Sequence, residues 1–286
     1  MALNLTPEQQ EIFDRVVGIV RQFVRRKTKI IPTLHRVLPA TLLCASLMLG
    51  AQQTFAQTKT TDTTSQTILS DKALFSLAFQ AQNAGNTTKA IELYTQAIAL
   101  NPNYADTYYN RGNEYYHLKE YEAAIKDYNQ AIALDPKNAK MYFNRGVVQY
   151  EVKNYEAAIK DYNQAITLDP KNARMYLNRG AVYYEINNYK EAIRDYNQVV
   201  YLDEKYKQIY RNRGAVHYEM SNYEAAIKDY SQAIIFEPTN AEMYKLRASS
   251  YALSGNLTAA QVDARRACDL GDCELFKVLN KVDSNE

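Results

Sequence analysis

The sequence has no tryptophan, and its 286 residues include only three cysteines, nine glycines and seven prolines. Three cysteines are too few for the disulfide scaffold of a small secreted domain. The low glycine and proline content excludes collagen-like and low-complexity chains. The net charge is only +2, and residues 57–286 carry 27 basic against 29 acidic side chains. We call residues 57–286 the body of the chain. Because it lacks a concentrated basic surface, it is not expected to bind nucleic acid.

Tyrosine is abundant, but all 25 tyrosines lie between Tyr94 and Tyr251, so the ends of the chain follow other rules. Residues 1–36 carry seven basic and three acidic side chains, and positions 6–26 predict an amphipathic helix. This helix is either a stub at the membrane surface or a segment upstream of the true translation start.

The segment 37–56 that follows carries no charge, and its mostly apolar run, residues 37–51, is shorter than the ~20 apolar residues that span a bilayer. Thr54 and Ala56 are the small residues expected before a cleavage site. The run predicts a signal peptide; an uncleaved signal-anchor and a buried helix are the alternatives. Residues 57–70 predict a flexible Thr/Gln/Ser linker. We therefore expect the body to be exported, periplasmic or secreted, or membrane-anchored with its repeats outside the cytoplasm.

The body repeats every 34 residues. An alanine recurs at this interval, and taking it as position 20 defines six units. Each unit predicts two helices, A and B, joined by a short turn, and a proline at position 32 ends helix B in four units. The units are 71–104, 105–138, 139–172, 173–206, 207–240 and 241–268, and residues 269–286 predict a capping helix and tail.

Unit two reads YYNRGNEYYHLKEYEAAIKDYNQAIALDP and closely resembles the tetratricopeptide repeat. Gly112, Ala124, Tyr128, Ala131 and Pro136 match the family's positions 8, 20, 24, 27 and 32. The resemblance covers about residues 71–268. It implies an all-α fold, a right-handed α-solenoid of stacked helix-turn-helix units, that mediates protein–protein interaction rather than catalysis. It implies no cofactor, metal or small-molecule substrate.

Positions 7 and 23 vary together. Units two to six have arginine and aspartate there, whereas unit one has Leu77 and Leu93. We expect a salt bridge between helices A and B, since a partly buried arginine favours a bidentate carboxylate; arginines facing a ligand are the alternative. The predicted pairs are Arg111–Asp127, Arg145–Asp161, Arg179–Asp195, Arg213–Asp229 and Arg247–Asp263.

The resemblance further implies that positions 2, 5, 6 and 9 of helix A face a peptide-binding groove. Position 6 is asparagine in four units, and an asparagine can both donate to and accept from a peptide backbone. Solvated side chains on an exposed face are the alternative. The candidate groove residues are Asn110, Asn144, Asn178, Asn212, Tyr109, Asn113, Phe143, Lys140, Arg174, Arg211 and Lys245.

Position 5 changes from apolar to basic along the units, which suggests a ligand with an acidic end; ordinary surface charge is the alternative. A carboxylate clamp known in some relatives is incomplete here, because Tyr109 and Asn178 do not match it.

Cys268 and Cys273 flank a predicted turn and form either a disulfide or two packed thiols. The leading hypothesis is an exported scaffold that binds an extended partner peptide. Its competitor is an assembly subunit of a membrane or envelope complex that docks through its convex or edge surface.

Overall fold

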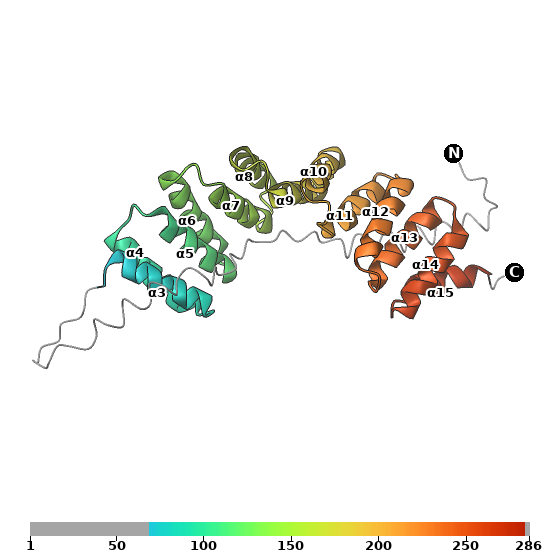
Figure 1. The fold of residues 1–286 in the computed structure, drawn as a ribbon, viewed down its shortest axis with the longest axis horizontal. Helices are drawn as coiled ribbons and strands as arrows, with labels where there is room; N and C mark the ends of the chain where they lie inside the picture. The colour runs from blue at the N-terminus through green and yellow to red at the C-terminus, as the bar shows by residue number, and fades with distance from the viewer. Residues whose placement is uncertain (1–68, 284–286) are drawn as a thin grey trace, which may run out of the picture. The chain divides into compact units, whose positions relative to one another are not determined.

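The computed structural model describes residues 69–283, so the segments expected at 1–36 and 37–56 and most of the linker lie outside the described residues. Residues 69–283 form thirteen α-helices and no strand (Figure 1), which confirms the all-α solenoid of helix-turn-helix units. The A helices are α3 (Asp71–Asn83), α5 (Ala105–His117), α7 (Ala139–Glu151), α9 (Ala173–Glu185), α11 (Gln208–Glu219) and α13 (Ala241–Leu253). The B helices are α4 (Thr87–Leu100), α6 (Tyr121–Leu134), α8 (Tyr155–Leu168), α10 (Tyr189–Leu202), α12 (Tyr223–Phe236) and α14 (Leu257–Asp269). A last helix, α15, spans Glu274–Asp283. Within this range none of the helices combines the length and the apolar character that a membrane crossing requires.

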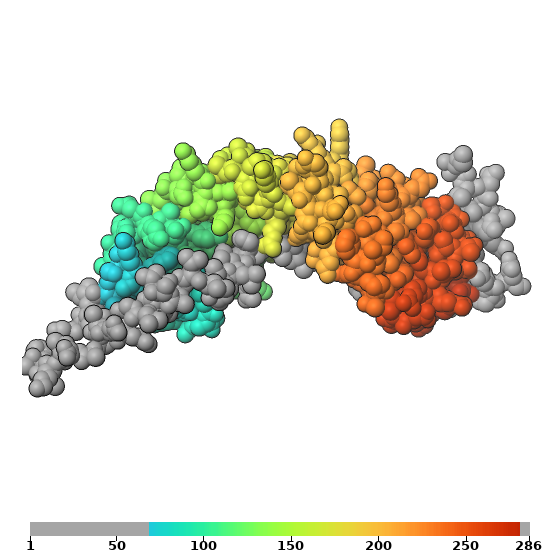
Figure 2. Space-filling model, viewed as in Figure 1, coloured from blue at the N-terminus to red at the C-terminus, as the bar shows by residue number. Residues whose placement is uncertain are grey.

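The described residues divide into two compact units. The N-terminal unit ends at Leu168 and holds α3–α8; the C-terminal unit starts at Asp169 and holds α9–α15. In the C-terminal unit a single core runs from Leu177 on α9 to Leu279 on α15. The helices of this unit, coloured yellow to red, form one continuous surface in the space-filling view (Figure 2). Stacking therefore supplies the core that one helix pair is too small to build.

Each turn between helices A and B uses a residue with positive φ at position 15. Glycine occupies the position in the first and last repeats, at Gly85 and Gly255. The four middle repeats place a residue with a side chain in the same left-handed conformation, which such residues adopt only at a cost. Those residues are Lys119, Lys153, Asn187 and Ser221, with φ between 58° and 62°. Asparagines then cap several B helices; the side chain of Asn222, for example, accepts from the amide of Ala225.

The glycine at position 8 is explained by the tyrosine at position 24. In the N-terminal unit a Cβ built on Gly146 would lie 2.8 Å from Cε1 of Tyr162. In the C-terminal unit a Cβ on Gly180 would lie 2.5 Å from Cε1 of Tyr196. Both tyrosines are fully buried. The missing side chain on helix A therefore makes the space that a large aromatic ring on helix B fills.

Candidate functional site

The structure brings together every arginine–aspartate pair expected from positions 7 and 23. In each pair Nε donates to one carboxylate oxygen and Nη2 donates to the other, at 2.6–2.9 Å. These are Arg111–Asp127, Arg145–Asp161, Arg179–Asp195, Arg213–Asp229 and Arg247–Asp263. The paired geometry joins the guanidinium and the carboxylate at the helix A–helix B interface, as the salt-bridge interpretation expects. In the first repeat Leu93 is buried and Leu77 is 39% exposed.

The third guanidinium nitrogen has a partner that sequence reasoning missed. Nη1 of Arg145 donates to Asn129 at 2.6 Å, and Nη1 of Arg213 donates to Asn197 at 2.8 Å. Both acceptors are at position 25 of the preceding repeat, where a row of small polar residues was the available signal. The guanidinium of Arg145 also lies 5.7 Å from the ring centre of Tyr142 at position 4, within cation–π range. Arg145 and Arg213 thus each join their own helix pair to the one before it within the same unit.

In the N-terminal unit the candidate residues converge on Asn144. Its Nδ2 donates to the hydroxyl of Tyr109 at 3.0 Å and to Oδ1 of Asn113 at 2.8 Å. Oδ1 of Asn113 also accepts from the hydroxyl of Tyr128 at 2.7 Å. Asn144 is fully buried, and its Oδ1 has no hydrogen-bond partner. Both amide protons are therefore used inside the protein, and a buried acceptor is left unmatched.

The other candidates of this unit lie nearby in the fold but differ in exposure. Phe143 is buried, with its ring centre 5.8 Å from that of Tyr162, and so contributes to packing. Asn110 on α5 is half-buried, whereas Lys140 on α7 is exposed. Burial raises the pKa of the Tyr109 hydroxyl above its ordinary value of 10.

In the C-terminal unit Asn178 is the most unusual candidate. Only 1% of the residue is exposed, and neither its Nδ2 nor its Oδ1 has a hydrogen-bond partner. Asn212, the next position-6 residue, is also buried, and Arg174 is exposed. A solvated row was the alternative for position 6, but Asn144, Asn178 and Asn212 are all shielded from water. A buried amide without partners costs free energy, on the order of 1–3 kcal/mol.

The basic residues at position 5 are engaged with carboxylates, which the sequence alone did not indicate. Arg211 donates from Nη2 to Glu242 at 3.2 Å. Lys245 is buried and donates to Asp272 at 2.6 Å and to Glu274 at 3.3 Å. The positive charges expected at one end of the groove, those of Arg211 and Lys245, are therefore paired with carboxylates of the same chain. Among residues 69–283 no cluster of His, Cys, Asp or Glu is arranged to hold a metal ion.

The family models for the TPR repeat and the tetratricopeptide repeat match this sequence repeatedly. The matched residues are 83–116, 112–153, 153–186, 182–221 and 208–240. The chain belongs to the tetratricopeptide repeat family. Tetratricopeptide repeats are generally non-enzymatic scaffolds for protein–protein interaction, and no catalytic family is indicated.

Solved structures of tetratricopeptide repeat proteins share this fold. YrrB, described as a TPR protein with an unusual peptide-binding site, is 23% identical; the alignment covers 66% of this chain and 97% of YrrB, with a TM-score of 0.59. PilF of Pseudomonas aeruginosa is 21% identical over 76% of this chain and 97% of its own, with a TM-score of 0.60. MamA is 21% identical over 58% of this chain and 91% of its own, with a TM-score of 0.56. At these identities the similarity establishes the fold. No curated protein matches the sequence.

Proposed function

We propose that this tetratricopeptide repeat protein binds an extended segment of a partner protein through the asparagines at position 6 of its A helices. The observation that carries the proposal is Asn178, a buried amide with an unused donor and an unused acceptor, which a peptide reaches once the neighbouring side chains move aside. A peptide unit offers one N–H and one C=O, so it complements such an amide whatever the ligand's side chains are. The chain itself is then a non-catalytic scaffold.

Asn144 is suited to a narrower task in the same function. Its Nδ2 is already bonded to Tyr109 and Asn113, and only Oδ1 lacks a partner. Those bonds fix the amide orientation and leave an acceptor, so the complementary ligand group is a donor such as a peptide N–H. The two asparagines therefore recognise a peptide backbone in different ways: Asn178 can both donate and accept, and Asn144 can only accept.

The test begins with peptides selected from a random library on the full-length protein, whose affinities are then titrated against variants. We expect Asn178→Ala to weaken binding by roughly tenfold to a hundredfold, the effect of one buried hydrogen-bonding group. The same change removes an unmatched polar group, so thermal stability should be kept or increased. Asn188→Ala is the matched control, because Asn188 is exposed and makes no capping hydrogen bond. Unchanged affinity of the Asn178→Ala variant for a verified peptide would rule out the asparagine row.

A second function, docking into a larger membrane or envelope complex, is favoured by one surface feature. Tyr201 on α10, Ile235 on α12 and Val262 on α14 are 83%, 70% and 64% exposed, and they come from the B helices of one unit. A contiguous apolar patch marks a contact surface, so this second function requires that the three side chains lie on one such patch. If docking uses this surface, Tyr201→Ser with Ile235→Ser should abolish recovery of the native complex, whereas Asn178→Ala should leave it intact.

We also propose that the repeats are exported. Support comes from the basic region and the short apolar run of residues 37–56, which ends in small residues. Chemical sequencing of the N-terminus of the mature protein tests this proposal. A mature chain that begins at Gln57 is expected, and a cytoplasmic protein that retains residues 37–56 would contradict it.

A further inference from the structure

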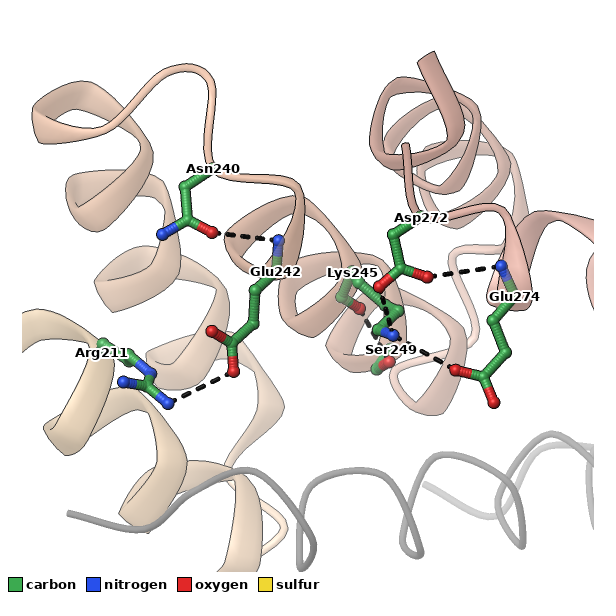
Figure 3. A network of polar contacts seen from close by, with 7 residues as sticks. All are labelled: Arg211, Asn240, Glu242, Lys245, Ser249, Asp272 and Glu274. Carbon is green, nitrogen blue, oxygen red and sulfur yellow. Dashed lines mark hydrogen bonds and ion pairs between the residues drawn. The ribbon is translucent and has the colours of Figure 1, made fainter. Parts of the chain in front are cut away.

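Lys245 on α13 is a buried cation held by the end of the chain. Only 3% of the residue is exposed. Its Nζ donates to Oδ2 of Asp272 at 2.6 Å and to Oε2 of Glu274 at 3.3 Å (Figure 3). An ammonium group removed from water needs compensating carboxylates, and here both come from the junction of α14 and α15.

The junction itself is closed by several independent bonds. We call residues 268–274 the C-terminal turn. Gly271 adopts a φ of +102° after α14 ends, and the amide of Asp272 donates back to the carbonyl of Ala267 at 2.9 Å. A disulfide joins Cys268 and Cys273 across the turn. The two cysteines therefore enclose Asp272, and Glu274 follows directly, so the disulfide holds the acidic side chains in place.

Lys245 lies at position 5, one of the helix A positions expected to face a ligand. In the same unit Arg211 occupies the equivalent position on α11 and meets Glu242 (Figure 3). Glu242 belongs to a helix of the repeat stack, whereas the carboxylates on Lys245 belong to the cap that follows the last repeat. Leu275 and Leu279 keep α15 in the core of this unit, so the contact at Lys245 can exchange only by movement of the C-terminal turn between α14 and α15.

We propose that Lys245 is a carboxylate-binding site that the C-terminal turn occupies, and that the Cys268–Cys273 disulfide keeps it occupied. A dithiol reductant opens the site: it supplies two electrons and two protons, the S–S bond breaks, each cysteine becomes a thiol, and the dithiol becomes a cyclic disulfide. The released turn then uncovers the ammonium for the carboxylate of an acidic peptide. Only the peptide nature of that ligand rests on the proposed function; the opening of the turn does not.

The opening is measured by acylation of lysine amines on the full-length protein, quantified by mass spectrometry with and without a dithiol. We expect labelling of Lys245 to rise on reduction by on the order of tenfold, because the hydrogen-bonded carboxylates are no longer held against it. Lys207, paired with Glu237 at 2.8 Å, is the internal control and should not change. Circular dichroism verifies that the helices persist. Equal labelling of Lys245 in oxidised and reduced protein would overturn the proposal.

A second variant separates the acidic turn from the disulfide. Asp272→Asn with Glu274→Gln keeps the shape of both side chains and removes both charges, so it should raise Lys245 labelling even in the oxidised protein. In this variant a synthetic peptide, acetyl-Gly-Asp-Ser-Glu-amide, should protect Lys245, and acetyl-Gly-Asn-Ser-Gln-amide should not. Equal protection by both peptides would show that Lys245 does not select carboxylates. None of these readouts depends on Asn178, so failure here and failure of the asparagine row are distinguishable.

Discussion

Replacement of Gly180 by alanine tests the packing rule that links position 8 to position 24. The new Cβ would lie 2.5 Å from Cε1 of Tyr196, 2.8 Å from its Cδ1 and 3.3 Å from Cβ of Asp195. The tyrosine is fully buried, so its ring has no free space into which it can move. Either the ring leaves its rotamer or α9 and α10 separate.

Two effects of opposite sign decide the magnitude. Alanine favours the helix over glycine by about 0.8–1 kcal/mol. Overpacking a filled core costs about 1–3 kcal/mol, and contacts near 2.5 Å place Gly180 toward the upper end of that range. We therefore expect Gly180→Ala to lower the free energy of unfolding by about 1–2 kcal/mol net.

Urea denaturation followed by circular dichroism measures this difference. Gly112→Ala is the matched control, because its Cβ would approach Tyr128 no closer than 3.0 Å, where a small ring shift relieves the contact. The control should be neutral or slightly stabilising. If Gly180→Ala proves as stable as the control variant, the tyrosine does not select glycine and the packing rule fails. The last repeat pairs Ala248 with Ala264, whereas the first repeat pairs Ala78 with the buried Tyr94, so the rule applies to the four repeats that carry glycine at position 8.

Three further predictions follow from single contacts. Arg213→Lys removes the bidentate contact with Asp229 and should destabilise by about 1–2 kcal/mol in urea denaturation; an unchanged midpoint would contradict the pairing. Burial raises the pKa of Glu114 above its ordinary 4.5, so its contribution to stability is full below pH 4.5 and is lost as pH rises through the folded pKa. Glu114→Val should therefore raise the free energy of unfolding at pH 7 and make it depend less on pH, as measured by urea denaturation at several pH values. A free energy of unfolding that depends more steeply on pH in the variant would refute the direction of the pKa shift. Lys153→Gly relieves a left-handed φ of 60° and should stabilise by about 0.5–1 kcal/mol in a thermal melt, while Asn187→Gly, at a position where asparagine tolerates that conformation, should gain less.

The fold could be predicted from the sequence because the same spacing of small and aromatic residues recurs in six units. Position 20 is alanine in every unit, and each of these alanines is buried between helices A and B. The arginine–aspartate pairs were readable for a related reason: when leucine replaced both residues in the first repeat, the two positions changed together. Covariation within one chain carries the same information that a set of related sequences would.

The environment of the candidate site could not be predicted, because it depends on contacts outside the 34-residue pattern. Nothing in the spacing of Asn144 indicates that Asn113 and Tyr109, from the preceding repeat, consume its amide protons. Lys245 shows the same limit, since its partners belong to the cap, which has no counterpart in the other repeats. A repeat pattern predicts which way a side chain points, but it does not predict which neighbouring side chain forms a hydrogen bond or ion pair with it.

The arginine that reaches back to the preceding repeat gives the array a direction. Nη1 of Arg111 donates to Thr95, and Nη1 of Arg247 donates to Ser231, in both cases from a later helix A to the helix B before it. Deleting repeats from the C-terminal side therefore leaves the remaining ones of these arginines with their acceptors, whereas deletion from the N-terminal side removes the acceptor of the first one that is left. Within residues 69–283 no helix B precedes the first repeat, and that repeat carries Leu77 in place of arginine. Engineered shortening or extension of this protein should accordingly be made at its C-terminal end, with any new first repeat bearing leucine at that position.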